Sequence, residues 1–276
     1  PKKFEYKEGK IVEVYTAKQE KGSEANHCVV FTVIFSDGSL EKGMEIRILV
    51  PRFGLINERK NRLHEVVRLS GVNIPIGDDD KPLIIKVASI PTAKLQVYFI
   101  DNEDYFKRKT IFNNKSGKFH SDNDERCLFF CKGVLETVIK LGWSPDIIHC
   151  NDWMSSLVPL LMKTSYNEQH IFENSKCIFS IYDNSFKEKL DKKMADKIID
   201  EDISKDMLKS LSKPDYNSLI KIASEYADAV IKPSSIKNKT LEKFISDFSS
   251  KNKVHEIEDG DKFVDSHYKL YNEILK

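Results

Sequence analysis

One short stretch, PDIIHCNDWMSSLVPLLMK at residues 145–163, concentrates side chains that can do chemistry. Two isoleucines are followed at once by His149, Cys150, Asn151, Asp152 and Trp153, and a helical pattern then begins. A histidine, an amide, a carboxylate and an indole in one strand-to-helix turn could form part of a polar ligand site. Two structural alternatives stay open: Asp152 could cap the helix that begins near Trp153, and Trp153 could belong to the core.

Two further strand ends carry polar residues. Residues 182–185, Tyr-Asp-Asn-Ser, follow the strand-like segment KCIFSIY, and residues 232–235, Lys-Pro-Ser-Ser, follow DAVIK. In an open parallel sheet, ligands bind beyond the carboxyl ends of the strands. Each position alone could be explained by capping or packing, but three such ends together favour a binding site at one edge of a sheet.

The elements that would position these residues alternate along the chain. Several strand-like segments are continuous β-branched runs, as expected for strands covered on both faces. They occur at residues 10–16, 45–51, 83–89, 95–101, 146–150, 176–182, 228–234 and 253–258, and helical patterns at 124–141, 153–164, 216–226, 235–247 and 261–275. This alternation predicts an α/β fold that is Rossmann-like, with a mainly parallel sheet and helices on both faces.

Composition excludes several functional classes. The 276 residues suggest one large domain or two small ones. A net charge of +1 argues against nucleic acid as a partner. No apolar stretch approaches the roughly 20 residues needed to span a membrane, and the first ten residues have no signal-peptide core. Five cysteines at irregular spacing indicate reduced thiols in a cytoplasmic protein, and Cys127 with Cys131 is expected to be a buried pair rather than a metal site.

We expect residues 1–276 to form a single domain. Within it, residues 187–215 are dense in charge and poor in aromatics, which predicts a solvated helical excursion or a mobile segment.

Five segments in the right order resemble bacterial glycogen and starch synthases. They are PDIIHCNDWMSSLVPLLMK, YFIDNEDYFKR, SDNDERCLFFCKGVLE, CIFSIYDNSFKEKL and YADAVIKPS. The segment EKGMEIRILVPRFGLINERKNRLHEVVRLSG, residues 41–71, further resembles a shorter subgroup of the family.

The resemblance implies one half of a two-Rossmann-domain glycosyltransferase, namely the N-terminal, acceptor-side domain. The family transfers glucose from ADP-glucose, or UDP-glucose in some members, to the non-reducing end of an α-1,4-glucan with retention. It implies no metal and no cofactor, and α-glucan and ADP-glucose as partners, with a second chain as one way to supply the missing domain.

By the same resemblance, Asp152, Tyr182 and Asn184 are the expected catalytic residues. Asn151 and Asp152 can bind sugar hydroxyls, because a carboxylate accepts hydrogen bonds and an amide both donates and accepts them. Trp153 would back the sugar or anchor the turn. The remaining residues expected to bind substrate are His149, Asp122, Asn123, Arg126 and Lys21.

Three departures from the family pattern bear on catalysis. Lys21 and Gly22 stand where the family has a Lys-x-Gly-Gly loop, and Ser23 and Glu24 obstruct the approach of a phosphate. Tyr182 replaces a family histidine, and residues 26–40 are strand-like where the family has a helix. The sequence therefore leaves three hypotheses: a glucosyltransferase domain, a non-catalytic glucan-binding or regulatory half-domain, and a structural domain whose strand-end polar groups are caps.

Overall fold

The computed structural model of the protein describes residues 31–36, 44–90, 95–142, 144–182, 185–249, 253–257 and 263–276. The predicted strand at 10–16, as well as Lys21 and Asn184, lies outside these residues.

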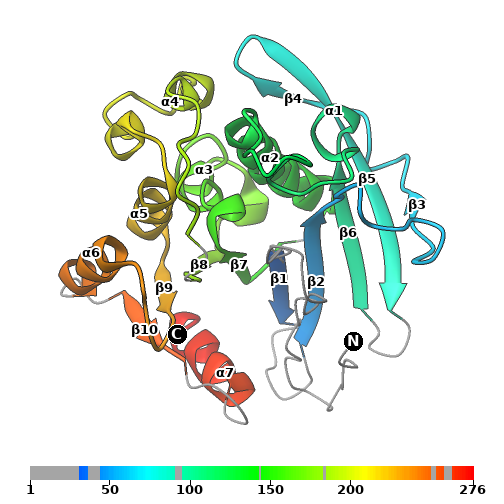
Figure 1. Ribbon diagram of the computed structural model, residues 1–276. Helices are drawn as coiled ribbons and strands as arrows, with labels where there is room; N and C mark the ends of the chain where they lie inside the picture. The colour runs from blue at the N-terminus through cyan, green and yellow to red at the C-terminus, as the bar shows by residue number, and fades with distance from the viewer. Residues whose placement is uncertain are drawn as a thin grey trace.

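A mixed sheet forms the centre of the molecule (Figure 1). Its order over the described strands is β10-β9-β8-β7-β1-β2-β6-β5-β3, with β4 paired to β5 outside this path. The strands are β1 (Phe31–Ser36), β2 (Met44–Pro51), β3 (His64–Glu65), β4 (Val72–Ile76), β5 (Asp79–Ile90), β6 (Leu95–Asp101), β7 (Ile147–Asn151), β8 (Lys176–Ser180), β9 (Ala229–Lys232) and β10 (Val254–Glu256).

Six of these strands run in the same direction. The pairs β7–β8, β8–β9, β9–β10 and β2–β6 are parallel, and β1 is antiparallel to both β2 and β7, so β2 and β7 share one direction. The carboxyl ends of β2, β6, β7, β8, β9 and β10 therefore meet at one edge of the sheet. The predicted Rossmann-like α/β fold with a mainly parallel sheet is confirmed.

Two parts of the sheet are antiparallel. Of the strand-like residues 26–40, the structure describes Phe31–Ser36, which form β1 and insert antiparallel between β2 and β7. The predicted strand at 83–89 belongs to the longer β5, which forms a hairpin with β4. Gly77, with a φ of +59°, stands in the tight turn of this hairpin, where a residue without Cβ is favoured.

Helices cover the two faces of the sheet unequally. The helices are α1 (Glu103–Phe106), α2 (Asn123–Leu141), α3 (Val158–Lys163), α4 (Met194–Ile198), α5 (Tyr216–Tyr226), α6 (Lys239–Ser249) and α7 (Phe263–Ile274). The main core lies between the sheet and α2, α3, α5 and α6, while α7 covers the opposite face, where Leu270 and Tyr271 pack against Ile147, Ile178 and Ile231 (Figure 1).

The segment 187–215 contains α4 and the 3₁₀ turn η4 (Lys209–Ser212). It buries apolar side chains, and the Lys197 ammonium contacts Asp124 Oδ2 at 2.7 Å and Glu125 Oε1 at 2.8 Å in the first turn of α2. Its buried apolar residues are Leu190, Met194, Ile198, Ile203, Leu208 and Leu211. The segment thus contacts the first turn of α2; its mobility in solution stays a prediction.

Candidate functional site at the carboxyl ends of β7 and β8

The turns that follow β7 and β8 lie side by side. Asn151 is paired with Ser180 in the parallel ladder, so Tyr182 emerges beside it two residues later. The Tyr182 hydroxyl donates to Asn151 Oδ1 at 3.1 Å. Asn151 is half-buried and Tyr182 is 43% exposed, so both side chains border solvent at the sheet edge. We call Asn151, Asp152 and Tyr182 the strand-end site.

Asp152 has an unusual backbone conformation, with φ of +58° and ψ of −174°. Residues with a Cβ rarely adopt it, and such conformations cost on the order of 1–3 kcal/mol unless their surroundings enforce them. Here the Asp152 amide donates to the Ser180 carbonyl at 3.0 Å, and its carbonyl accepts from the Ser155 amide at 3.1 Å. Backbone conformations of this kind cluster at functional sites, which favours a functional role for this turn.

The Asp152 carboxylate does not cap the following 3₁₀ turn η2 (Trp153–Ser155), since no hydrogen bond joins it to that turn's amides in the described structure. It accepts instead from the Tyr216 hydroxyl, at 2.9 Å from Oδ1. The same hydroxyl contacts the backbone carbonyl of Tyr182. Asp152 is 3% exposed and lies behind Asn151 and Tyr182.

Sequence reasoning missed Tyr216. The Asp215-x-x-Ser218 capping box that starts α5 can be read from the sequence, and the predicted helix 216–226 is confirmed. No local pattern, however, indicates that the first residue of this helix reaches back to turns that precede it by more than 30 residues.

Trp153 anchors the turn. Its side chain is 3% exposed and packs in an aromatic cluster with Phe112, Phe119 and Phe186, with ring centroids 4.8–6.5 Å away. The predicted helix 153–164 is shorter than expected: η2 comes first, and α3 begins only at Val158, with Pro159 in its first turn. Proline is tolerated there because it lacks an amide proton that the first turn does not use.

His149 points away from the main core, toward α7. Its Nδ1 lies 2.6 Å from the Tyr271 hydroxyl and its Nε2 lies 2.6 Å from Ser180 Oγ. A neutral imidazole needs one acceptor and one donor, and two hydroxyls supply both. Burial, with a smaller contribution from the nearby His267, lowers the pKa of His149 to about 3. His149 therefore joins β7 to α7 as a neutral group.

Asp122 and Asn123 stand at the start of α2 and hold the preceding loop. Asp122 forms a two-point ion pair with Arg108, one contact being 2.8 Å between Nη1 and Oδ1. Burial alone would raise the pKa of the Asp122 carboxyl, but the paired guanidinium outweighs it and keeps that pKa below its usual value. The Asn123 amide donates to the Phe112 carbonyl at 3.0 Å.

Arg126 is completely buried one turn into α2. Its Nη1 donates to the Ile111 carbonyl and to Asn123 Oδ1, both at 2.6 Å. Nε and Nη2 have no hydrogen-bond partner among the described residues, but the guanidinium lies over the rings of Phe53 and Phe106, 5.6 and 5.4 Å from their centroids. Burial lowers the pKa of Arg126 to about 10. These contacts fix the loop 107–121, and none of them is made with a residue of the strand-end site.

The third strand end is next to the second, since the Ile181 amide donates to the Ile231 carbonyl at 2.8 Å. The third strand end carries Lys232, whose ammonium pairs with Glu256 at 2.9 Å.

The described cysteines, Cys127, Cys131, Cys150 and Cys177, are buried free thiols, as predicted for the 127/131 pair. Over the described ranges, no three His, Cys, Asp or Glu side chains are close enough together to hold a metal ion. None of the helices described is both long and apolar enough to cross a membrane.

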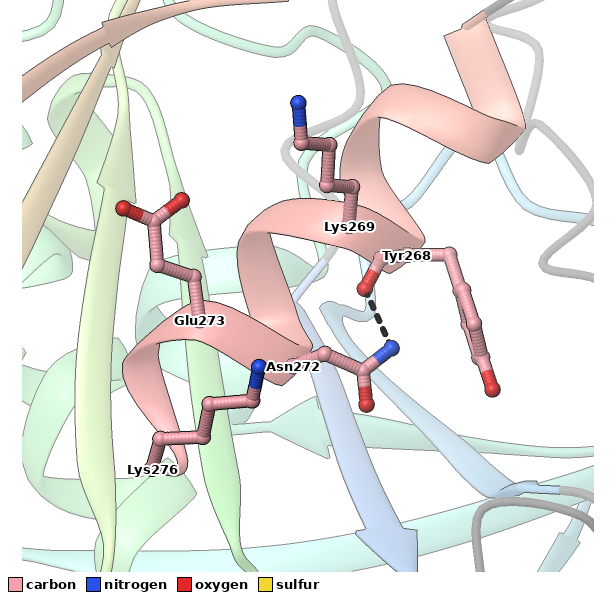
Figure 2. A pocket seen from close by; sticks show the side chains of 5 residues that line it. All are labelled: Tyr268, Lys269, Asn272, Glu273 and Lys276. Atoms are coloured by element: carbon pink, nitrogen blue, oxygen red, sulfur yellow. Dashed lines mark hydrogen bonds between the residues drawn. The ribbon is translucent and has the colours of Figure 1, made fainter.

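A separate hollow lies along the outer face of α7. It encloses about 660 Å³, part of it open solvent, and is lined by Tyr268, Lys269, Asn272, Glu273 and Lys276. Figure 2 shows these side chains, with the Asn272 amide donating to the Tyr268 carbonyl at 2.9 Å. Four of them come from α7 and Lys276 follows its end, and none belongs to the strand-end site.

Comparison with known proteins decides the family. Residues 38–241 match the model of the starch synthase catalytic domain, which is well over half of the chain. The chain belongs to the starch synthase catalytic domain family.

Relatives of this starch synthase domain are described as glycogen synthases. Those of Chlorobium luteolum and Chlorobium chlorochromatii are 43% and 45% identical over 159 residues, which is 57% of this chain and 32% of each relative. The chain thus spans about a third of the length of the curated relatives it matches. The catalytic domain of starch synthase IV from Arabidopsis thaliana, solved with ADP and acarbose, has a TM-score of 0.59 at 18% identity, covering 79% of this chain and 45% of that one. At this identity the likeness supports the fold alone.

Proposed function

We propose that the chain is the glucan-side part of a glucosyltransferase that transfers glucose from ADP-glucose to an α-1,4-glucan. In this reaction the bond between the anomeric carbon and the diphosphate breaks, and a bond to a hydroxyl of the glucan end forms. The products are ADP and a glucan longer by one glucose. Membership in the starch synthase catalytic domain family supports the reaction class.

The observation that carries this proposal is the strand-end site. A half-buried amide, an exposed tyrosine and a carboxylate converge at the edge where open α/β sheets bind ligands. Asn151 and Tyr182 offer the accessible hydrogen bonds and an aromatic face, and both suit a sugar, which presents hydroxyls on its rim and C–H groups on its faces. Asp152 supplies the acceptor behind them.

ADP-glucose is the donor that best fits the relatives. The solved starch synthase IV domain is described as bound to ADP, and the described residues of the present chain form one Rossmann-like sheet. Contacts to the nucleotide would come mainly from a second domain. We therefore expect the chain alone to bind glucan and to transfer glucose very slowly.

One observation favours a second candidate, a glucan-binding half-domain without catalysis. Lys21 and Gly22 are followed by Ser23 and Glu24. A backbone that approaches a phosphate closely needs glycine at these positions, and the Glu24 carboxylate repels the phosphate. A second chain that supplied nucleotide contacts would restore the first function.

The test combines binding with turnover. Maltoheptaose binding is measured by calorimetry, and glucose transfer by the label incorporated from radiolabelled ADP-glucose into glycogen. We expect measurable binding that Tyr182→Ala weakens and that Tyr268→Ala, in the α7 hollow, leaves unchanged. Absence of binding would contradict the proposal, and rapid transfer by the chain alone would exclude the half-domain alternative.

A further inference from the structure

We propose that Tyr216 is a positioning residue of the strand-end site. Its hydroxyl ties the turn after β7 to the turn after β8 and thereby fixes Asn151 and Tyr182 relative to each other. This inference rests on the proposed function and deepens it, because it assigns a role to a residue outside both strand-end motifs.

The position of the Tyr216 ring is fixed by the start of α5 and by a neighbouring aromatic ring. It starts α5, where Asp215 caps the helix by accepting from the Ser218 amide at 2.9 Å and pairs with Lys189 at 2.5 Å. The ring is 1% exposed and meets Phe186 edge to face, with centroids 5.6 Å apart. The capped helix and the packed ring therefore fix the position of the Tyr216 hydroxyl.

The hydroxyl has one proton and faces two acceptors. One is Asp152 Oδ1 at 2.9 Å, in the turn after β7, and the other is the Tyr182 carbonyl, in the turn after β8. Because the two oxygens belong to different turns, the phenol bridges them. A phenylalanine would keep the ring in place and remove this donor from both oxygens.

The bridge acts on the residues that meet solvent. Asp152 directly follows Asn151, and the Tyr182 carbonyl belongs to the residue whose hydroxyl bonds Asn151 Oδ1. Since Asp152 keeps a conformation that isolated residues avoid, the contacts around it must enforce that geometry. Loss of the Tyr216 bridge should let the two turns shift apart, so that Asn151 and Tyr182 no longer keep fixed positions relative to each other.

Tyr166 provides a matched control. It is also a buried tyrosine whose hydroxyl donates to a carboxylate at 2.9 Å, Glu136 Oε1, yet it touches neither turn. Tyr216→Phe and Tyr166→Phe thus delete the same group from similar surroundings. Their difference reports position and cancels the general effect of losing a buried hydroxyl.

The experiment measures maltoheptaose affinity for the full chain and both variants, together with their backbone amide NMR spectra. Tyr216→Phe should weaken affinity about fivefold, the scale of one hydrogen bond, and Tyr166→Phe less than twofold. Tyr216→Phe should also move the amide signals of Asn151 and Tyr182, whereas Tyr166→Phe should leave them in place. In an Asp152→Ala background, Tyr216→Phe should add less than twofold.

Each outcome separates this inference from the function on which it rests. Equal affinities for wild type and Tyr216→Phe, or equal losses in both tyrosine variants, would overturn the positioning role. If the wild type does not bind maltoheptaose, the proposed function fails. In that case the amide signals still test whether Tyr216 bridges the two turns, and unmoved signals in Tyr216→Phe would overturn the bridge.

Discussion

Two groups of motif residues differ sharply in what their side chains face. The strand-end site after β7 and β8 places Asn151 and Tyr182 against solvent, with a strained Asp152 behind them. At the start of α2, Asn123 and Arg126 are fully buried and bonded to the loop before them. Both groups include residues that resemble family motifs, so resemblance alone does not separate residues that meet a ligand from residues that hold a loop.

The difference follows from where each group sits in the fold. At the carboxyl ends of β7 and β8, the side chains of Asn151 and Tyr182 still reach solvent, whereas the first turn of α2 is enclosed by the loop 107–121 and by α4. The comparison predicts that changes at α2 cost stability without selective loss of binding, and that changes at the strand ends do the opposite.

The largest effect should come from Arg126→Ala. It removes a buried guanidinium and leaves the Ile111 carbonyl and the Asn123 amide oxygen without this donor. We expect the free energy of unfolding to fall by about 3 kcal/mol, while maltoheptaose affinity of the folded protein stays within twofold. Urea unfolding measures the first quantity and calorimetry the second.

Arg108→Ala is the control for this change. Arg108 pairs with Asp122 across a partly exposed surface, where the expected loss is under about 1 kcal/mol. Similar losses in the two arginine variants would contradict the distinction between a buried anchor and a surface pair.

A second, smaller effect concerns His149 and pH. The folded-state pKa is about 3 and that of the unfolded chain is near 6.5, so between these values the unfolded chain binds a proton that the folded protein does not. Stability therefore rises with pH across this window and falls on acidification, by about 2 kcal/mol between pH 6.5 and pH 5.

His149→Gln tests that assignment, because glutamine does not titrate. Other groups contribute to the acid dependence of both proteins, so the quantity to measure is the difference between wild type and variant in stability lost from pH 7 to pH 5. The idea fails if the two proteins lose the same amount.

Much of the fold could be predicted from the sequence. Seven of the eight predicted strands and all five predicted helices fall on described elements, because β-branched runs and helical periodicity report local burial. The directions of β1 and β5 could not be predicted, since direction depends on which strand a segment pairs with. The contact between Tyr216 and Asp152 was equally out of reach, as was the left-handed backbone at Asp152, because both arise from packing across the chain.

Asp152 allows a test of that backbone. Alanine and glycine both delete the carboxylate that accepts from Tyr216, but only glycine adopts a positive φ without strain. The free energy of unfolding of Asp152→Gly should therefore be about 1 kcal/mol higher than that of Asp152→Ala. At Lys221, an exposed residue within α5, the order should reverse, since glycine is a poorer helix former than alanine. An alanine variant at 152 as stable as the glycine variant would mean that no strain is stored there.

The smallest stability effect is expected at the strand ends, and it probes the comparison most finely. The hydrogen bond from Tyr182 to Asn151 borders solvent, where water replaces a lost partner, so Tyr182→Phe and Asn151→Ala should each change the free energy of unfolding by no more than about 0.5 kcal/mol. Each should nevertheless weaken maltoheptaose binding severalfold, because the removed groups face the proposed sugar. The double variant should lose less affinity than the sum of the two, since the residues act as a pair. Stability losses near those of Arg126→Ala, with affinity unchanged, would place Asn151 and Tyr182 with the loop-holding residues instead.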